Sequence, residues 1–460
     1  MITFVVVVVG FISALVYYFL CRAVTAAIPS LLPFDPEWTA TKVRFLITAG
    51  AKVNAVTESN FTPLMGASAL TGDPEVIKVL IAAGTRPDAR DKDGNTSLMF
   101  AAGHNGNPEV IKALVAAGVE VDAVDNDGMT PLMWAATHSD NPEIIKALIE
   151  AGAQLEVRDK DGWTPLMLAT VSNDKLEIVN TLIAAGAEVD ARDEDGLTPL
   201  MRAAISDGKF EFIKALIKAG AELDARDKDG WTPLMKALRY NRDLESIKTL
   251  ITAGAKLDAR DKDGWTPIMY AVAFSDIEVI KFLMAAGADA NSRDNSGGIP
   301  LMHAARFADN LEVIEFLMTT GAKVNMRDQD GKTPLMYASV RNKNPKIISA
   351  LIEAGAEVNA KDNDGWTPLI YAAASTDNPE ILKALLAADA QLDARGEYGW
   401  TPLIHASALN KNPEIVTTLL RAGADGKLTS TEGKTAFDYA AENPNVKDSE
   451  AYWLLNEARF

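Results

Sequence analysis

The chain has 460 residues, with 45 Lys and Arg against 63 Asp and Glu, which gives a formal net charge of −18. This balance excludes a basic nucleic-acid-binding protein, because neutralising phosphates requires clustered net positive charge. A single cysteine excludes a disulfide scaffold and an all-cysteine zinc site, and 48% hydrophobic residues is too many for a disordered acidic chain.

The first element in chain order is an uncharged stretch from Ile2 to Leu20. At about 1.5 Å of rise per residue it can cross the roughly 30 Å hydrocarbon layer, which predicts a membrane helix within an N-terminal hydrophobic segment, residues 1–22. A buried helix of a soluble core is the less favoured interpretation.

The hydrophobic segment is either an uncleaved anchor or a cleaved signal. No Lys or Arg precedes it, as one would in a secretory signal, so we expect a single-pass N-terminal anchor in a membrane. The small residues Val24, Thr25 and Ala26 keep cleavage as the alternative, which would yield a secreted or periplasmic array. Arg22 after the span leans towards a cytoplasmic array but leaves the side of the membrane open.

After a Pro-rich joint over residues 23–37, the rest of the chain is a repeat. The tripeptide Thr-Pro-Leu or a close variant recurs every 34 residues, with one step of 33. Its copies start at Thr62, Thr96, Thr130, Thr164, Thr198, Thr232, Thr266, Ile299, Thr333, Thr367, Thr401 and Thr435. Such a period means stacked supersecondary units, so one elongated array replaces the roughly three domains that the length suggests. We expect an N-terminal capping half-unit at 38–61, eleven repeats over 62–434 and a C-terminal capping unit at 435–460.

The repeat over residues 125–157 predicts a turn and two antiparallel helices. The residues from Asp125 to Gly128 are typical of a turn, and Thr130 with Pro131 marks the start of a short apolar helix. Asn141 begins a second helix in the same way, and Gly152 ends it.

These residues resemble the ankyrin repeat: Asp-x-x-Gly-x-Thr-Pro-Leu, then Ala-Ala, then Glu-Ile-x-Lys-x-Leu-Ile-x-Ala-Gly-Ala. The tetratricopeptide repeat has a 34-residue period, but its Trp-Leu-Gly-Tyr pattern is absent. Most repeats here carry one residue more than the usual 33, as in Ser139 to Pro142, whereas the repeat containing Asp276 lacks it. The resemblance covers Lys42 to Phe460. It implies an all-α repeat solenoid of stacked helix-turn-helix units with a turn or hairpin edge.

One departure from the ankyrin pattern is systematic. The family has His after Thr-Pro-Leu, where this chain has Met at 65, 99, 133, 167, 201, 235, 269, 302 and 336, and Ile at 370 and 404. A thioether cannot donate a hydrogen bond, so we expect greater reliance on apolar packing between repeats. A metal-binding ladder is not expected, because neighbouring repeats lie roughly 10 Å apart.

Catalytic and metal-binding patterns are scarce. The chain has no Gly-rich phosphate loop, no Gly-x-Ser-x-Gly and no His-Glu-x-x-His, so we expect no enzyme activity, cofactor or small-molecule substrate. The repeated Asp-x-x-Asp-x-Asp-Gly is similar to a calcium loop, but in register with Gly230 the required ligands are replaced by Ala225 and Lys236. We therefore expect a solvated turn edge, on which these carboxylates pair with the arginines of the motif. The arginines are Arg192, Arg226, Arg260, Arg293 and Arg327.

Positions that vary between repeats are the candidates for partner binding. They are the residue before Thr-Pro at the tip of the turn, the residue after Met, and the residues three and four positions later on the same helix face. The resemblance implies that these positions line a concave surface that grips a partner. The predicted site residues are Trp163, Arg202, Trp231, Lys236, Arg239, Tyr240, Trp265, Tyr270, Phe274, His303, Arg306, Phe307, Tyr337 and Arg341.

Two alternatives remain open for these residues. The tryptophans, which also occur at turn positions 366 and 400, would pack on neighbouring turns purely for stability. The cationic and aromatic stripe would be ordinary exposed helix residues paired to local carboxylates. We expect a non-enzymatic, membrane-tethered scaffold that binds an acidic or extended segment of a protein, with a soluble secreted module as the alternative. Nucleic-acid binding is disfavoured by the acidic surroundings of the stripe.

Overall fold

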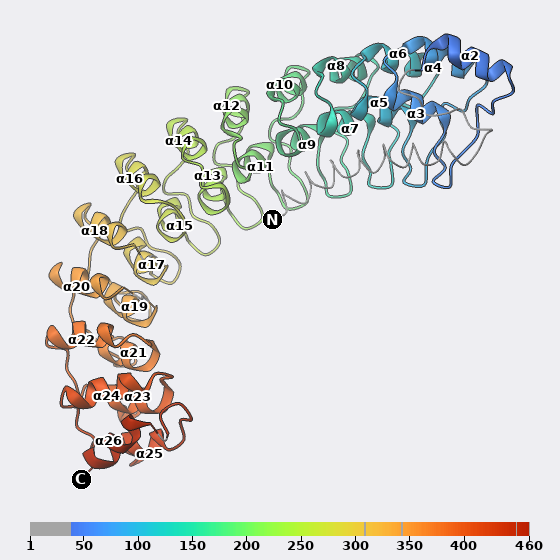
Figure 1. Cartoon of the computed structure of the whole chain (residues 1–460). Helices are drawn as coiled ribbons and strands as arrows, with labels where there is room; N and C mark the ends of the chain where they lie inside the picture. Colours follow the sequence, from blue (N-terminus) through green and yellow to red (C-terminus); the bar gives the residue numbers. More distant parts are fainter. Residues whose placement is uncertain (1–37, 308–309, 342–343, 448, 460) are drawn as a thin grey trace. The chain divides into compact units, whose positions relative to one another are not determined.

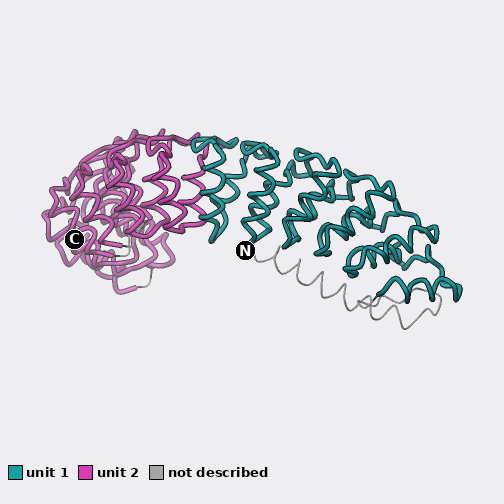
Figure 2. Tube along the Cα trace, turned by 90° about the horizontal axis from the view of Figure 1, so that it is seen from above, with its two compact units in different colours: residues 1–228 teal, residues 229–460 magenta. Residues whose placement is uncertain are grey.

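The computed structural model describes residues 38–307, 310–341, 344–447 and 449–459, and within these ranges every regular element is a helix. The helices come in pairs, one pair per repeat, in a row of first helices and a row of second helices (Figure 1). The chain forms two compact units, residues 1–228 and 229–460 (Figure 2). The prediction of an all-α repeat solenoid is confirmed, whereas the helix predicted for residues 2–20 lies outside the described residues.

In the unit over residues 1–228, each helix packs on its counterpart in the next repeat. The first helices are α3 (Pro63–Leu70), α5 (Ser97–His104), α7 (Pro131–His138), α9 (Pro165–Ser172) and α11 (Pro199–Ile205). The second helices are α4 (Pro74–Ala82), α6 (Pro108–Ala116), α8 (Pro142–Glu150), α10 (Leu176–Ala184) and α12 (Phe210–Lys218), with α2 (Ala40–Thr48) packed against α4.

The unit over residues 229–460 is built in the same way. Its first helices are α13 (Pro233–Lys236), continued by the π-helix η1 (Ala237–Asn241), then α15 (Pro267–Phe274), α17 (Pro300–Phe307), α19 (Pro334–Arg341), α21 (Pro368–Ser375), α23 (Pro402–Leu409) and α25 (Ala436–Ala440). Its second helices are α14 (Leu244–Thr252), α16 (Ile277–Ala285), α18 (Leu311–Thr319), α20 (Pro345–Glu353), α22 (Pro379–Ala387), α24 (Pro413–Arg421) and α26 (Glu450–Ala458). A 3₁₀ turn, η2 (Glu397–Gly399), precedes α23, and an isolated bridge joins Thr429 to Thr435.

Most first helices begin at a Thr-Pro pair, and in five of the described first helices the methionine three residues after the threonine takes part in the cap. The Thr130 hydroxyl accepts a hydrogen bond from the Met133 N–H at 3.3 Å, and the Met133 sulfur accepts one from the Thr130 N–H at 3.4 Å. The same sulfur contact recurs at Thr62, Thr96, Thr266 and Thr333. Met133 is fully buried, so this residue packs between repeats and also satisfies a backbone donor. The sequence pattern predicted only the packing role.

Turns of consecutive repeats are joined through their backbones. The N–H of Asn126 donates to the Asp93 carbonyl at 2.8 Å, and the N–H of Lys160 donates to the Asp127 carbonyl at 3.0 Å. Gly128 has a φ of 83°, a left-handed conformation in which a side chain would be strained. Its Cα also lies close enough to the next turn that an added Cβ would approach Asp159 Cα to 3.2 Å. The conformation and the close approach together require glycine here.

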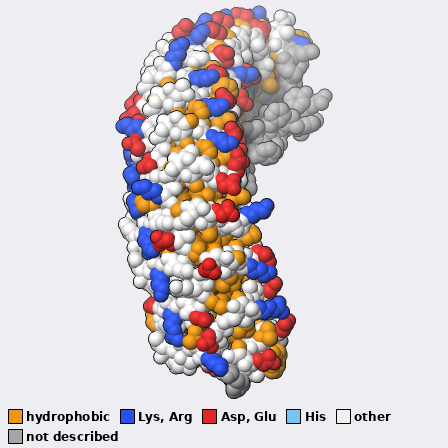
Figure 3. Space-filling view, turned by 90° about the vertical axis from the view of Figure 1, so that its left-hand side faces the viewer, with side chains coloured by type: hydrophobic (Ala, Val, Ile, Leu, Met, Phe, Trp, Pro, Cys, Tyr) orange, Lys and Arg blue, Asp and Glu red, His pale blue; other side chains and the backbone are white. Residues whose placement is uncertain are grey.

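The second helices present mixed charge to the solvent. Exposed Glu and Lys side chains pair three residues apart, as in Glu143–Lys146 at 2.6 Å and Glu380–Lys383 at 2.6 Å. Figure 3, which looks at the side of the structure that is on the left in Figure 1, shows acidic and basic side chains interspersed along a band of apolar ones. Such exposed pairs contribute little to stability, because water screens their attraction. This face therefore offers no extended region of a single charge.

Candidate partner-binding site

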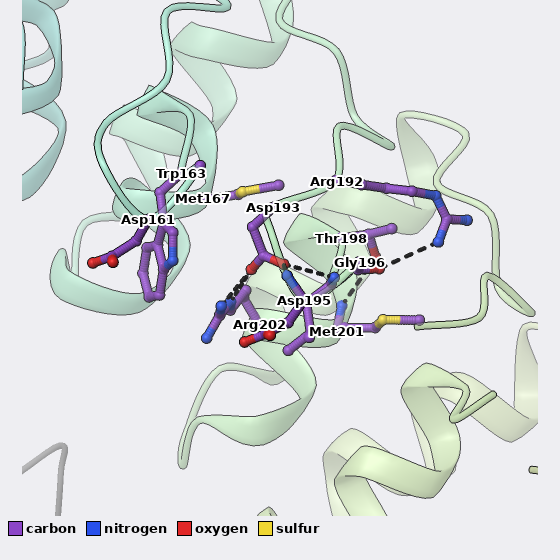
Figure 4. Close-up of polar contacts among 12 residues, drawn as sticks. Asp161, Trp163, Met167, Arg192, Asp193, Asp195, Gly196, Thr198, Met201 and Arg202 are labelled. Atoms are coloured by element: carbon purple, nitrogen blue, oxygen red, sulfur yellow. Dashed lines mark hydrogen bonds and ion pairs between the residues drawn. The ribbon is translucent and has the colours of Figure 1, made fainter. Parts of the chain in front are cut away.

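In the turns from Asp193 to Asp362, one aspartate of each turn is buried and is not a solvated charge. Asp193 is 7% exposed, and its Oδ1 accepts hydrogen bonds from the N–H groups of Asp195 at 3.0 Å and Leu197 at 2.8 Å. Its Oδ2 accepts from Nε of Arg202 at 2.9 Å (Figure 4). Arg202 follows the helix methionine, so this carboxylate fastens the turn to the first helix of the same repeat.

The same link, between residues nine positions apart, recurs with different donors. Asp125 accepts from the Trp134 indole at 2.9 Å, and Asp328 from the Tyr337 hydroxyl at 2.6 Å. The equivalent pairs are Asp261–Tyr270, Asp294–His303, Asp362–Tyr371 and, with serine as acceptor, Ser430–Tyr439. Burial first, and then the hydrogen bond to the carboxylate, raises the pKa of the tyrosines at 270, 337 and 371, so each phenol is a neutral donor.

The arginine of the turn motif contacts backbone oxygens, and not the carboxylates of its own motif. Nη1 of Arg293 donates to the carbonyl of Gly297 at 3.0 Å and to the carbonyl of Arg327, in the next repeat, at 2.9 Å. Arg192 makes the equivalent pair of contacts, the one within its own turn visible in Figure 4. Arg192 and Arg327 also approach a glutamate of the next repeat to 3.7 Å. For Arg192, Arg293 and Arg327 the predicted pairing with carboxylates of their own motif was therefore wrong, because two backbone carbonyl groups converge on each of these guanidinium groups.

The tryptophans at the turn tips are half-buried between the residues that follow the methionines. The Trp265 ring centre lies 5.1 Å from that of Tyr270 in its own repeat and 4.3 Å from that of His303 in the next. Trp366 and Trp400 contact His405 from both sides, at 4.4 and 5.0 Å. The indoles thus join successive repeats, as the packing alternative expected; their role in binding stays a prediction.

The fourteen predicted site residues do not form one surface. Within the first unit, Trp163 and Arg202 are half-buried and stack, with the guanidinium carbon 4.0 Å from the ring centre (Figure 4). Within the second unit, Lys236, Tyr270 and His303 are 9%, 5% and 8% exposed. Direct partner contact by these three does not fit their burial, because the turn and the neighbouring aromatic rings cover them.

The remaining predicted residues of the second unit are accessible to different degrees. Trp231, Arg239, Trp265, Phe274 and Tyr337 are half-buried, and Tyr240, Arg306 and Phe307 are exposed. Arg341 ends helix α19, but its side chain lies outside the described residues.

Five of these residues form a continuous group that we call the Arg–aromatic cluster: Arg239, Tyr240, Phe274, Arg306 and Phe307. The guanidinium carbon of Arg239 lies 4.1 Å from the centre of the Phe274 ring, and that of Arg306 lies 5.0 Å from the centre of Phe307. The two phenylalanine rings are stacked with their centres 6.5 Å apart. Tyr240 and Phe307 are 52% and 43% exposed, which makes them the most exposed aromatic residues on the described first helices. The cluster therefore offers both apolar surface and cationic groups.

The buried rings support the cluster from below. The His303 ring is parallel to the Phe307 ring to within 2°, with 6.4 Å between the ring centres. The Tyr270 ring centre lies 6.4 Å from that of Phe274. Because Asp294 and Asp261 hold His303 and Tyr270 in turn, each exposed phenylalanine is connected through one buried ring to its own turn. Two predicted site residues, Tyr270 and His303, thus have a positioning role, which the sequence pattern alone did not distinguish from contact.

Local irregularities surround the cluster. Helix α13 continues as the π-helix η1, which carries Arg239 and Tyr240, and Arg242 after it has a φ of 59°. The next repeat is the one that is a residue shorter, and a surface pocket of about 600 Å³ lies where its two helices join. The pocket is lined by Arg242, Val272, Ala273, Phe274, Ser275, Asp276, Ile277, Glu278, Asn310 and Val313. Backbone irregularities such as π-helices are frequent at functional sites.

The first unit has a different aromatic group, which sequence analysis missed. The His104 and His138 ring centres lie 5.8 Å apart, and both rings contact Trp134, at 5.9 and 5.4 Å. The two histidines are 34 residues apart, five positions after their methionines, so aligning the repeats would have placed them side by side.

No helix in the described part of the chain is long and apolar enough to cross a bilayer. Residues 2–20, on which the membrane-anchor prediction rests, are not among the described residues.

Comparison with known families agrees with the geometry. A model of ankyrin repeats, built of three copies, matches seven overlapping segments: residues 39–125, 98–193, 171–261, 200–294, 239–328, 301–396 and 373–458. A search of curated proteins found no match. Arrays of this kind are protein–protein interaction modules. The chain belongs to the ankyrin repeat family, as its turn and cap residues predicted.

Proposed function

We propose that the array binds a partner protein through the Arg–aromatic cluster. The observation that carries this proposal is the pair Arg239 and Arg306. Among the described residues neither guanidinium donates a hydrogen bond or forms an ion pair, although the chain carries a net charge of −18. Arginine and tyrosine are enriched at the centres of protein interfaces. Two such cations on accessible rings are therefore better suited to an interface than to a solvated surface.

The partner segment is acidic in this proposal. Carboxylates on the partner would pair with Arg239 and Arg306, and its apolar groups would cover Tyr240 and Phe307. A guanidinium lying on an aromatic ring is partly desolvated, which strengthens its attraction for an anion. The exposed pairs of the second helices already neutralise each other, so that face competes poorly for such a segment.

The test replaces the cluster while preserving the fold. We expect the combined variant Arg239→Glu, Arg306→Glu and Phe307→Ser to lose capture of the partner that the wild-type chain retains. The control is Lys411→Glu with Lys427→Glu, which makes the same change in net charge at exposed positions away from the cluster. Unaltered capture by the cluster variant, with an unchanged circular-dichroism spectrum, would refute the proposal.

We also propose that residues 2–20 tether the array to a membrane as an uncleaved anchor. The support is the absence of charge in that segment, which is long enough to cross the hydrocarbon layer as a helix. Mass spectrometry of the native N-terminus tests it: a start at Met1 supports the anchor, and a start near Ala27 supports the alternative of a soluble secreted or periplasmic module. No catalytic role is proposed, since no catalytic motif accompanies the repeats.

A further inference from the structure

We propose that the Arg–aromatic cluster binds an extended segment of the partner protein. In this segment an acidic, an apolar and a second acidic residue occupy positions i, i+2 and i+4. This inference rests on the proposed function and specifies its ligand. It follows from the upper limit on the separation of Arg239 and Arg306 and from the single row of rings between them.

The two guanidinium groups are the fixed points of the site. Each lies against the face of a phenylalanine ring, at 4.1 Å for Arg239 and 5.0 Å for Arg306. A guanidinium carries its five N–H donors in its own plane, so contact through one face leaves the donors at its edge available for a carboxylate. The site therefore has two anion-binding positions with apolar surface between them.

The separation of these positions limits the spacing of the acids. Contacts of 4.1, 6.5 and 5.0 Å in series, from Arg239 through Phe274 and Phe307 to Arg306, place the guanidinium groups at most about 16 Å apart. An extended chain covers about 3.3–3.6 Å per residue, so residues i and i+4 lie roughly 13–14 Å apart. Positions i, i+2 and i+4 also share one face of an extended chain. The middle side chain then lies over the stacked rings of Phe274 and Phe307.

The width of the cluster favours an extended chain over a helix. Phe274 and Phe307 occupy equivalent positions on the consecutive helices α15 and α17, so the rings form a single row along the array. A helix with its side chains is about 10–12 Å across and would need contacts on both flanks of that row. An extended segment needs only the row itself.

The site is held in place before any ligand arrives. His303 lies under Phe307 and is fixed by Asp294 at 2.8 Å, while Tyr270 lies beside Phe274 and is fixed by Asp261. Rings whose positions are already fixed lose little conformational freedom on binding. A short peptide should therefore bind measurably by itself.

The experiment compares three fluorescent peptides binding to the full chain by anisotropy. The first is Gly-Ser-Glu-Ser-Leu-Ser-Glu-Ser-Gly, with the proposed spacing. The second, Gly-Ser-Glu-Leu-Ser-Ser-Glu-Ser-Gly, has the same composition with leucine on the opposite face. The third is an alanine-rich helical peptide with its two glutamates seven residues apart and leucine midway between them. We expect the first peptide to bind about tenfold more tightly than either of the others.

Single substitutions identify the two anion positions. Arg239→Gln and Arg306→Gln should each weaken the first peptide about tenfold, and added salt should weaken it further. Lys411→Gln, with the same loss of charge, should leave it unchanged. Equal affinity for the first two peptides, tighter binding of the helical peptide, or unchanged binding by both arginine variants would overturn the inference. If the cluster variant no longer captures the partner but the peptide affinities do not differ as expected, only the proposed spacing is wrong. If the cluster variant still captures the partner, the proposed function itself is wrong.

Discussion

Nε2 of His303 lies 2.8 Å from Oδ2 of Asp294, nine residues earlier, and the two residues fasten a turn to the helix that follows it. The other carboxylate oxygen of Asp294 accepts from the N–H groups of Ser296 and Gly298, both at 2.8 Å. Burial opposes ionisation of this carboxyl, but the hydrogen bonds from His303, Ser296 and Gly298 outweigh it and lower its pKa to about 2. The link thus depends on an ionised, buried carboxylate.

Asp294→Ala should destabilise the array by about 2–4 kcal/mol, because it leaves two N–H groups and an imidazole without their acceptor. The midpoint of urea unfolding measures this loss. The matched control is Asp263→Ala, which removes an exposed carboxylate from the preceding turn and should change stability by less than about 0.5 kcal/mol. Equal effects of the two substitutions would contradict the role assigned to the buried carboxylate.

His405 should make stability depend on pH. The residue nine positions before His405 is Gly396, where the linked turns have aspartate. Both ring nitrogens of His405 lack a hydrogen-bond partner in the described structure. Burial between Trp366 and Trp400 lowers the pKa of His405 to about 4. Because the unfolded chain binds a proton near pH 6.5 and the folded chain does not, stability is full above pH 6.5 and falls by about 3 kcal/mol between pH 6.5 and 4.

His405→Phe should remove this part of the pH dependence. We expect the variant to gain about 2–3 kcal/mol over the wild type between pH 7.5 and pH 4.5, measured as the change in their difference in unfolding free energy. An imidazole resonance for His405 that titrates near pH 6.5 in the folded protein would contradict the prediction.

Val124→Arg should stabilise the turn between two repeats. Val124 stands where the neighbouring turns carry arginine, and its side chain is 43% exposed. An arginine there would reach the carbonyls of Gly128 and Arg158, as Arg293 reaches those of Gly297 and Arg327. We expect a gain of about 0.5–1 kcal/mol in the free energy of unfolding. Val124→Gln, which lacks the forked donors, is the control and should give no gain.

Trp265→Ala tests whether a tryptophan at a turn tip stabilises the array by packing. The indole contacts Tyr270 and His303 in successive repeats, so its removal should cost about 2–3 kcal/mol, below the 3–5 kcal/mol of a fully buried tryptophan. A thermal-unfolding midpoint within a degree of the wild-type value would show that this tryptophan has no packing role.

Much of the fold was predictable because the same local sequence signals recur in the twelve copies of the repeat. Thr130, Pro131 and Gly152 fix the ends of helices through their own backbone chemistry, without reference to distant residues. The hydrogen bond accepted by the Met133 sulfur was not predicted, because a thioether is a weak acceptor and only the geometry of the cap brings it to the Thr130 N–H.

The candidate site was less predictable. Tyr270 and Phe274 are both aromatic residues on one helix face, yet Tyr270 is buried and Phe274 is accessible. The difference arises because Asp261 and Trp265 of the same repeat and Trp231 of the preceding one surround Tyr270. A pattern read along one helix cannot contain that information, whereas comparison of residues nine and 34 positions apart would have suggested it.

The anchoring aspartate accepts from an indole at Asp125, a guanidinium at Asp193, an imidazole at Asp294 and a phenol at Asp328. The acceptor is constant while the donor changes in size, charge and aromatic character. A repeat with this aspartate can therefore exchange one such donor for another and keep its anchorage, and the new side chain alters the support of a residue one helical turn away, as His303 supports Phe307. An array of this kind can diversify its recognition surface gradually, one repeat at a time, without passing through an unfolded ancestor.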